Sequence, residues 1–289
     1  MPTCIITDST AQFPTRLFPG QDFVRVVTLG VQFEEDPNTE PERIKTSQFP
    51  QTLEGTSGTA GEAFPRLVVP TVAELQALFS SLSSHYNEIV GIFLSGNLCP
   101  LLARAREAAK NLSGLIRIEI IDAQTTGPGL GFVVQSAARA AEEGRDARTI
   151  RHLVQGLLPH VFSILCIRGL TYLERIRTLD PAQAAVGEML GIIPVFVLEQ
   201  GRLIPVQKIR HARQLVDSFF EFVFEFDRIR HLALVQGVPS YPQEKKILRE
   251  RIEVEFPNLA ISEHIINPSL TAILGPHTIG VFVWEEEDS

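Results

Sequence analysis

The chain has 289 residues, of which 44% are hydrophobic and 21% are charged, a composition typical of a globular protein with a large core. Its 26 Lys and Arg against 34 Asp and Glu give a formal charge of -8, which argues against a nucleic-acid partner because phosphate contacts need a basic surface. The sequence carries no signal-peptide pattern and no apolar run long enough to cross a bilayer, so we expect a cytoplasmic protein that is not membrane-embedded.

The cysteines and histidines do not form a recognisable metal or disulfide pattern. Cys4, Cys99 and Cys166 are odd in number and lie in apolar segments, which predicts buried thiols. The seven histidines lack HxH or HxxxH spacing. We therefore expect no metal and no cofactor.

The first half of the chain alternates short apolar strands with amphipathic helices. This alternation favours an α/β domain whose parallel sheet is flanked by helices. Thr71 and Glu74 form a predicted capping box at the start of one helix. Residues 34–61 are polar and rich in Pro and Gly, which predicts a long loop. The predicted strands are residues 4–7, 23–33, 89–94 and 115–121. The predicted helices are residues 71–82, 100–109 and 148–159, and residues 125–131 are predicted to lead into a further helix that ends at residue 143.

Polar side chains follow three of these strands. Asp8 and Ser9 follow the first, Ser95 the third and Asp122 the fourth. Carboxyl ends of parallel strands meet at one edge of a sheet, where ligands of such folds bind. The turn after Ser95 leads into a helix that starts with Pro100, and free N–H groups there favour an anion. The alternative is a plain strand-to-helix turn without a ligand.

The second half of the chain predicts an α+β domain with a mixed or antiparallel sheet. We place a domain boundary at residue 159, which gives domains of residues 1–159 and 160–289 with a ligand cleft between them. The predicted strands are residues 161–167, 192–198, 202–206, 231–236, 260–266, 270–274 and 279–284, and the predicted helices are residues 170–179, 181–190, 211–226 and 242–256.

The helix predicted at residues 211–226 carries five phenylalanines that cannot all face one core. Some of them either line a partner or an apolar ligand, or are buried between layers.

Several motifs, in their order along the chain, resemble those of the DegV family of bacterial fatty-acid-binding proteins. Residues 5–11 (IITDSTA) are similar to the opening signature of the family. Residues 92–101 (IFLSGNLCPL) resemble its I-x-I-S-S-x-L-S-G-T segment, and residues 201–210 (GRLIPVQKIR) match G-x-L-x-P-x-x-K-x-R.

The resemblance implies a two-domain carrier and not an enzyme. In such a carrier a long-chain fatty acid is buried in an apolar tunnel between the domains, and hydroxyl and imidazole groups hold its carboxylate. The resemblance also implies a fatty-acid kinase as a partner, which phosphorylates the carboxylate of the bound lipid.

The chain departs from the family at the residues that hold the carboxylate. Leu67 stands where the family has a threonine, Cys99 replaces a serine, and Ile273 replaces a histidine. His277 and Arg177 are candidate substitutes, because a buried carboxylate needs hydrogen bonds or a cation. The predicted ligand-binding residues are Asp8, Ser9, Leu67, Ser95, Gly96, Asn97, Cys99, Arg177, Ile273 and His277.

Two alternative functions remain open. Because three polar donors are replaced, the site could instead bind another apolar ligand, such as an ester or an alcohol. The less supported alternative is a small-molecule transferase or hydrolase that uses Asp8, Ser95 and Asp122. Against this alternative, the sequence shows no Ser, His and acid triplet with recognisable spacing and no G-x-S-x-G turn.

Overall fold

The computed structural model describes residues 2–33, 44–50 and 65–286. Most of the loop predicted at residues 34–61 lies outside these ranges. Within them, no helix is long and apolar enough to cross a membrane. Besides the elements given below, the chain forms short 3-10 helices at η1 (Gln21–Phe23), η3 (Thr46–Gln48) and η4 (Leu158–His160).

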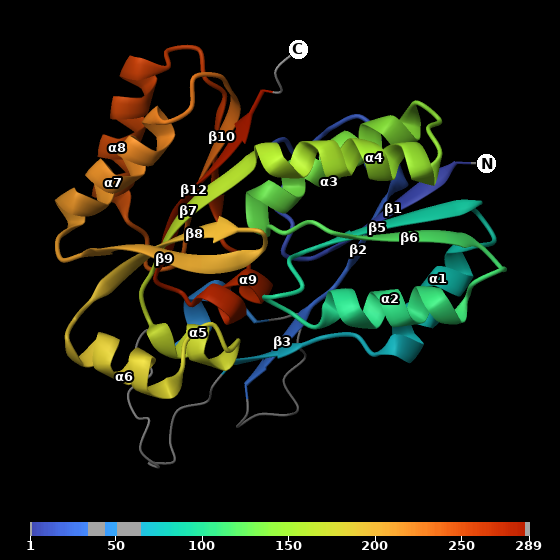
Figure 1. Ribbon diagram of the computed structural model, residues 1–289, viewed down its shortest axis with the longest axis horizontal. Helices are drawn as coiled ribbons and strands as arrows, with labels where there is room; N and C mark the ends of the chain where they lie inside the picture. The colour runs from blue at the N-terminus through green and yellow to red at the C-terminus, as the bar shows by residue number, and fades with distance from the viewer. Residues whose placement is uncertain (1, 34–43, 51–64, 287–289) are drawn as a thin grey trace.

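The first sheet has four parallel strands in the order β2-β1-β5-β6, which confirms the predicted parallel sheet. The helices α1 and α2 cover one face and α3 and α4 cover the other (Figure 1). All six residues of β1 are buried, as expected for a strand covered on both faces. The bounds are β1 (Thr3–Asp8), β2 (Val24–Val27), β5 (Glu88–Phe93), β6 (Arg117–Asp122), α1 (Val72–Leu82), α2 (Leu101–Asn111), α3 (Gly127–Glu142) and α4 (Ala147–Leu157).

The predicted capping box at the start of α1 is present. The Glu74 N–H donates to Thr71 Oγ1 at 3.2 Å, and the Thr71 N–H donates to Glu74 Oε2 at 2.7 Å. These two bonds satisfy backbone groups that the helix itself leaves unpaired. Three apolar residues of α1 then face the core: Leu75, Phe79 and Leu82.

The single strand predicted at residues 23–33 is wrong, because the chain turns between two strands there. The first part forms β2, and the second part forms β3 (Gly30–Phe33), which pairs antiparallel with β4 (Pro65–Val68) in a separate two-stranded sheet. At the break, the Leu29 N–H donates to Ser9 Oγ at 2.9 Å instead of to a neighbouring strand. This side-chain bond directs the chain away from the first sheet.

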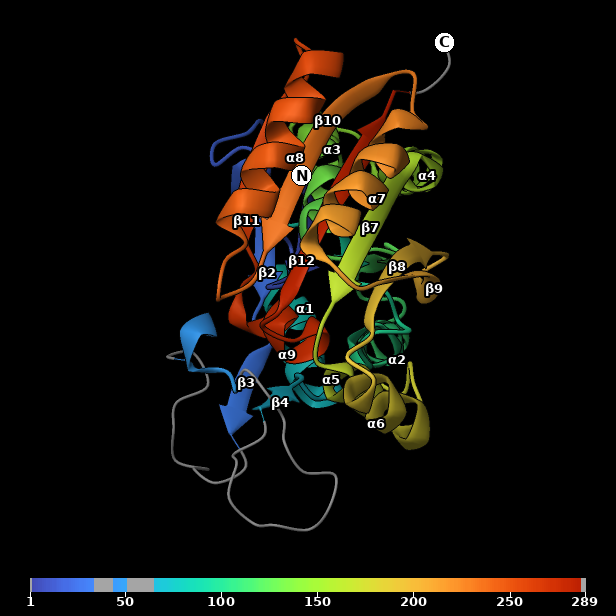
Figure 2. The same cartoon turned by 90° about the vertical axis from the view of Figure 1, so that its left-hand side faces the viewer.

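The second sheet has six strands in the order β11-β10-β12-β7-β8-β9, and only β10 and β11 are parallel. The predicted mixed sheet is therefore confirmed. The helices α7 and α8 cover one face of it, and α3 lies on the opposite side (Figures 1 and 2). The bounds are β7 (Val161–Ile167), β8 (Ile193–Glu199), β9 (Arg202–Ile209), β10 (Ile229–Gln236), β11 (Ile261–Ile265), β12 (Thr278–Glu285), α5 (Leu170–Arg175), α6 (Pro181–Met189), α7 (Ala212–Phe224) and α8 (Pro242–Glu255).

The strand predicted at residues 270–274 is wrong, because this segment is the helix α9 (Pro268–Leu274). Asn267 caps the helix, its Oδ1 accepting from the Leu270 N–H at 3.0 Å, and Pro268 occupies the first turn. A short apolar run fits a buried helix as well as a buried strand, and here the cap and the proline decide for the helix.

The phenylalanines of α7 and of the turn that follows it pack mostly between α7, α8 and the second sheet. Phe219 and Phe226 are buried there, whereas Phe224 is 57% exposed. This core includes Leu234 and Val281, which lie on the sheet face opposite to α3. The sequence left open whether these phenylalanines line a ligand or partner, or are buried between layers. Phe219 and Phe226 are buried between layers.

The two sheets share one continuous core. Leu130 of α3 and Phe282 of β12 belong to the same cluster of buried side chains. The first sheet uses only residues before 123, and the second only residues after 160. The domain boundary at residue 159 agrees with this division but stays a prediction.

Candidate functional site

Asp8, at the carboxyl end of β1, binds the neighbouring backbone. Its carboxylate accepts hydrogen bonds from the Thr10 N–H at 2.9 Å, the Thr10 hydroxyl at 2.6 Å and the Leu94 N–H at 2.8 Å. Burial raises the pKa of this carboxyl, and the hydrogen bonds oppose the rise. Asp8 thus joins β1 to the end of β5 inside the protein.

Ser9 joins the end of β1 to α9. Its hydroxyl lies 2.9 Å from that of Ser269, and its carbonyl oxygen accepts from Asn267 Nδ2 at 2.6 Å. Ser269 in turn donates to the Leu29 carbonyl at 2.7 Å. The polar atoms of Ser9 are therefore used within the fold.

Ser95 is fully buried beneath the turn between β8 and β9. Its hydroxyl donates to the Gly201 carbonyl at 2.6 Å and accepts from the Asn97 N–H at 3.1 Å. Gly201 adopts a φ of 77°, and a Cβ at this position would lie 2.4 Å from Ser95 Oγ. The hairpin of the second sheet thus closes directly over the serine predicted to bind a ligand.

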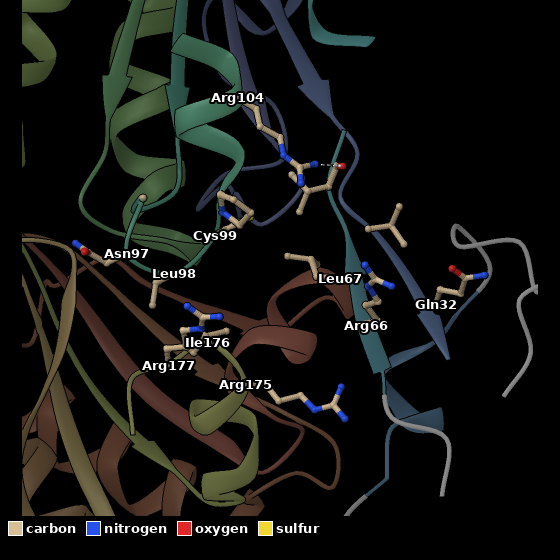
Figure 3. A pocket seen from close by; sticks show the side chains of 14 residues that line it. Gln32, Arg66, Leu67, Asn97, Leu98, Cys99, Arg104, Arg175, Ile176 and Arg177 are labelled. Atoms are coloured by element: carbon tan, nitrogen blue, oxygen red, sulfur yellow. Dashed lines mark hydrogen bonds between the residues drawn. The ribbon is translucent and has the colours of Figure 1, made fainter. Parts of the chain in front are cut away.

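A cavity of about 890 Å³ opens beside this edge, between β4, the start of α2 and the end of α5 (Figure 3). Its volume lies within the range of roughly 300–1,000 Å³ for small-molecule sites. The lining residues are Gln32, Arg66, Leu67, Val68, Val69, Gly96, Asn97, Leu98, Cys99, Pro100, Arg104, Arg175, Ile176 and Arg177.

Five of the predicted ligand-binding residues line this cavity together: Leu67, Gly96, Asn97, Cys99 and Arg177. They come from β4, the β5–α2 turn and the turn after α5, so the fold brings together residues far apart in the sequence. As ligand contacts they stay predictions.

Cys99 is a poor donor for a ligand. Its side chain is only 3% exposed, and burial raises the pKa of the thiol to about 12. The thiol therefore stays protonated near neutral pH, and S–H is a weak hydrogen-bond donor.

The other predicted residues lie outside the cavity lining. They are Asp8, Ser9, Ser95, Ile273 and His277. Ile273 is buried in the core at 1% exposure. The carbonyl of His277 accepts hydrogen bonds from the Arg168 N–H and the Tyr241 hydroxyl, both at 3.3 Å. The replacement of a histidine by Ile273 thus places an apolar side chain in an apolar cluster.

Asp122 caps its own turn and accepts from the Gln124 N–H at 2.9 Å. Asp8 and Ser95 are both engaged internally, so two of the three residues of the enzyme alternative are used within the fold. The described residues also contain no group of three or more His, Cys, Asp or Glu arranged to hold a metal ion.

Arg66, Arg104 and Arg175 line the cavity but were not predicted from the sequence. Arg104 of α2 donates to the carbonyls of Val69 at 2.6 Å and Pro70 at 3.0 Å, which holds its guanidinium at the wall formed by β4 (Figure 3). The only sequence signal is Arg104 lying one helical turn after Pro100, where it shares a face with the helix start.

The protein is thus a mixed α/β protein with two main sheets and the small β3–β4 sheet. A cavity lined by arginines and apolar residues lies at the carboxyl edge of its parallel sheet. A family model described as "Uncharacterised protein, DegV family" matches residues 2–286. The chain belongs to the DegV family.

Individual relatives cover nearly the whole chain. A DegV domain-containing protein from Deinococcus radiodurans is 25% identical over 288 residues, which is 97% of this chain and 98% of the relative. A fatty-acid-binding DegV family protein from Thermus thermophilus has a similar fold, with a TM-score of 0.80, 23% identity and coverage of 99% and 100% of the two chains. The Fatty Acid Kinase B3 protein of Streptococcus pneumoniae, solved loaded with linoleic acid, has a TM-score of 0.75, 15% identity and the same coverage.

Proposed function

We propose that this protein is a fatty-acid-binding carrier that holds its ligand in the cavity between β4, α2 and α5. The observation that carries the proposal is the combination, in one cavity, of an apolar wall of Leu67, Val69 and Leu98 with several guanidinium groups. A fatty acid needs both, because its chain favours an apolar surface and its carboxylate favours a cation. The fatty-acid ligands of the Thermus and Streptococcus proteins support the proposal.

Arg177 is the residue that we propose for the carboxylate. It lies on the side of the cavity opposite to Arg66, next to Ile176 and Leu98 (Figure 3). The hydroxyl of Ser95 is engaged by Gly201, and the described lining residues include no Ser, Thr or Tyr. A guanidinium therefore takes over the role that hydroxyl and imidazole groups have in the family pattern.

The proposal is tested on the purified protein after its lipids have been removed with organic solvent and identified by mass spectrometry. Adding oleate should raise the unfolding temperature, because a ligand that binds only the folded state stabilises it. Arg177→Gln should weaken binding, whereas Arg148→Gln on the exposed surface of α4 should not. If no lipid is extracted and no long-chain acid raises the unfolding temperature, the proposal is wrong.

The alternative that the ligand is an ester or a long-chain alcohol rests on the absence of hydroxyl donors in the described lining. The guanidinium groups oppose it, because a neutral ligand leaves them without a counter-charge. Oleyl alcohol is the matched probe, since it differs from oleate only at the head. Clear preference for the alcohol would reverse our assignment.

We also propose that a fatty-acid kinase acts on the bound lipid and that the protein itself performs no catalytic step. The name of the Streptococcus relative supports a kinase partner. A cytoplasmic location fits the three cysteines, which are buried and unpaired. Mixing the loaded protein with a fatty-acid kinase and ATP, and assaying the lipid for phosphorylation, tests the partner; cell fractionation tests the location.

A further inference from the structure

All charged side chains in the described lining of the cavity are positive. Its described lining contains four arginines and no Asp or Glu, although the whole chain has a formal charge of -8. A single carboxylate carries one negative charge, and one bidentate guanidinium satisfies it. The cavity therefore holds more positive charge than a fatty acid needs.

Two of the four arginines have no ionic partner among the described residues. Arg66 and Arg177 make no hydrogen bond from their side chains, and no ion pair, to any residue in the described ranges. Arg104 donates to the neutral carbonyls of Val69 and Pro70, which orient its guanidinium, and it also interacts electrostatically with the carboxylate of Glu74 on α1. The side chains of Arg66 and Arg177 are solvent-exposed, so water solvates both guanidinium groups until an anion enters the cavity.

The three cations come from different sides of the cavity. Arg66 extends from β4, Arg104 from α2 and Arg177 from the turn after α5, with Leu67 between them and Leu98 beside Arg177 (Figure 3). Arg177 has a φ of 58°, in the left-handed region that residues other than glycine seldom adopt. Such strained residues cluster at ligand sites, where the fold holds a side chain in place.

From this arrangement we infer that the cavity prefers a lipid whose head is a phosphate monoester, such as a lysophosphatidate, over a free fatty acid. A phosphate monoester carries close to two negative charges near neutral pH and has three terminal oxygens, so it can engage guanidinium groups from several directions. The apolar wall takes the acyl chain as before. The inference rests on the proposed function, since it keeps the acyl chain in the same cavity and changes only the head.

The test compares four probes by titration calorimetry on the delipidated full-length protein, below the concentrations at which the lipids aggregate. Oleoyl lysophosphatidate, oleate and monooleoylglycerol share one acyl chain, and glycerol phosphate carries the head alone. We expect lysophosphatidate to bind about tenfold more tightly than oleate, because an additional charge meets an additional guanidinium. Its affinity should also fall more steeply with salt than that of monooleoylglycerol.

Variants then connect the preference to the arginines. The double variant Arg66→Gln and Arg177→Gln should bind lysophosphatidate and oleate to a similar extent. Arg148→Gln, which removes an exposed charge outside the cavity, should keep the preference. The double variant Arg66→Lys and Arg177→Lys retains both positive charges and should keep part of the preference for lysophosphatidate.

Each contrary outcome has a distinct meaning. Oleate binding as tightly as lysophosphatidate to the unaltered protein overturns the inference and leaves the proposed function intact. Glycerol phosphate binding as tightly as the lipid also overturns it, since the site would then serve a free phosphate compound. If no acyl probe binds at all, both the inference and the proposed function fail.

Discussion

The carboxyl edge of the first sheet and the neighbouring cavity differ in how their polar groups are satisfied. At the edge, Asp8, Ser9 and Ser95 each accept or donate hydrogen bonds within the protein, and Asp8 and Ser95 are fully buried. In the cavity, the side chains of Arg66 and Arg177 make no hydrogen bond or ion pair with the described residues. Polar residues at strand ends can therefore hold a fold together, whereas the exposed guanidinium groups of Arg66 and Arg177 are available to an anionic ligand.

The largest effect that we predict from this comparison is on Asp8. Asp8→Ala leaves the N–H groups of Thr10 and Leu94 and the Thr10 hydroxyl without their acceptor. We expect the free energy of unfolding in urea to fall by about 3 kcal/mol, because several buried donors lose their partner together. Asp22→Ala on the surface should change it by less than about 0.5 kcal/mol. A stable Asp8→Ala variant with lost lipid binding would instead make Asp8 a ligand residue.

Gly201 offers a direct measure of how closely the hairpin covers Ser95. Gly201→Ala places a Cβ 2.4 Å from Ser95 Oγ at a φ of 77°. Gly144→Ala is a matched control, because Gly144 has the same φ and no atom within 4 Å of the added Cβ. We expect a loss of about 1 kcal/mol for Gly144→Ala and about 3 kcal/mol for Gly201→Ala in chemical denaturation. Equal losses would mean that the hairpin moves away from Ser95 at little cost.

A substitution at Cys99 tests whether an added hydroxyl donor in the cavity lining strengthens ligand binding. Cys99→Ser introduces a stronger donor at the lining, and we expect the affinity for oleate to rise about threefold. Cys166→Ser is the control, because Cys166 is equally buried but belongs to the core on the α7 side of the second sheet. Unchanged oleate affinity in Cys99→Ser would show that the head of the ligand does not reach this residue.

We also predict a dependence of stability on pH that arises from two histidines outside the cavity lining. Burial, together with the nearby His264, lowers the pKa of His231 from 6.5 to about 4, and burial also lowers that of His264. Both rings lie within hydrogen-bond distance of Ser262 Oγ, at 3.0 and 2.9 Å.

Since the unfolded chain binds more protons than the folded chain between pH 6.5 and about 4, the unfolding temperature should fall as the pH decreases through this range. His231→Gln should reduce the slope, whereas His85→Gln on the surface should not. The preference between lysophosphatidate and oleate should not depend on His231; a change in preference in His231→Gln would connect the two regions.

The sequence by itself determined most of the local structure. The apolar run of β1, the capping box at Thr71 and Glu74, and the alternation of strands and helices predicted the parallel sheet and its helices correctly. Local patterns succeed here because caps and periodic burial depend on residues close together in the chain. They failed at α9, because seven residues with an apolar pattern fit a helix or a strand equally well.

The tertiary structure alone decided which polar residues are available to a ligand. Ser95 stays a predicted ligand residue, but the fold brings the Gly201 carbonyl, 106 residues away in the chain, within hydrogen-bond distance of its hydroxyl. Arg66, Arg104 and Arg177 form a cationic cavity only because β4, α2 and the end of α5 meet in space. Neither fact has a local signal, since the partner of a polar group is set by packing between distant segments.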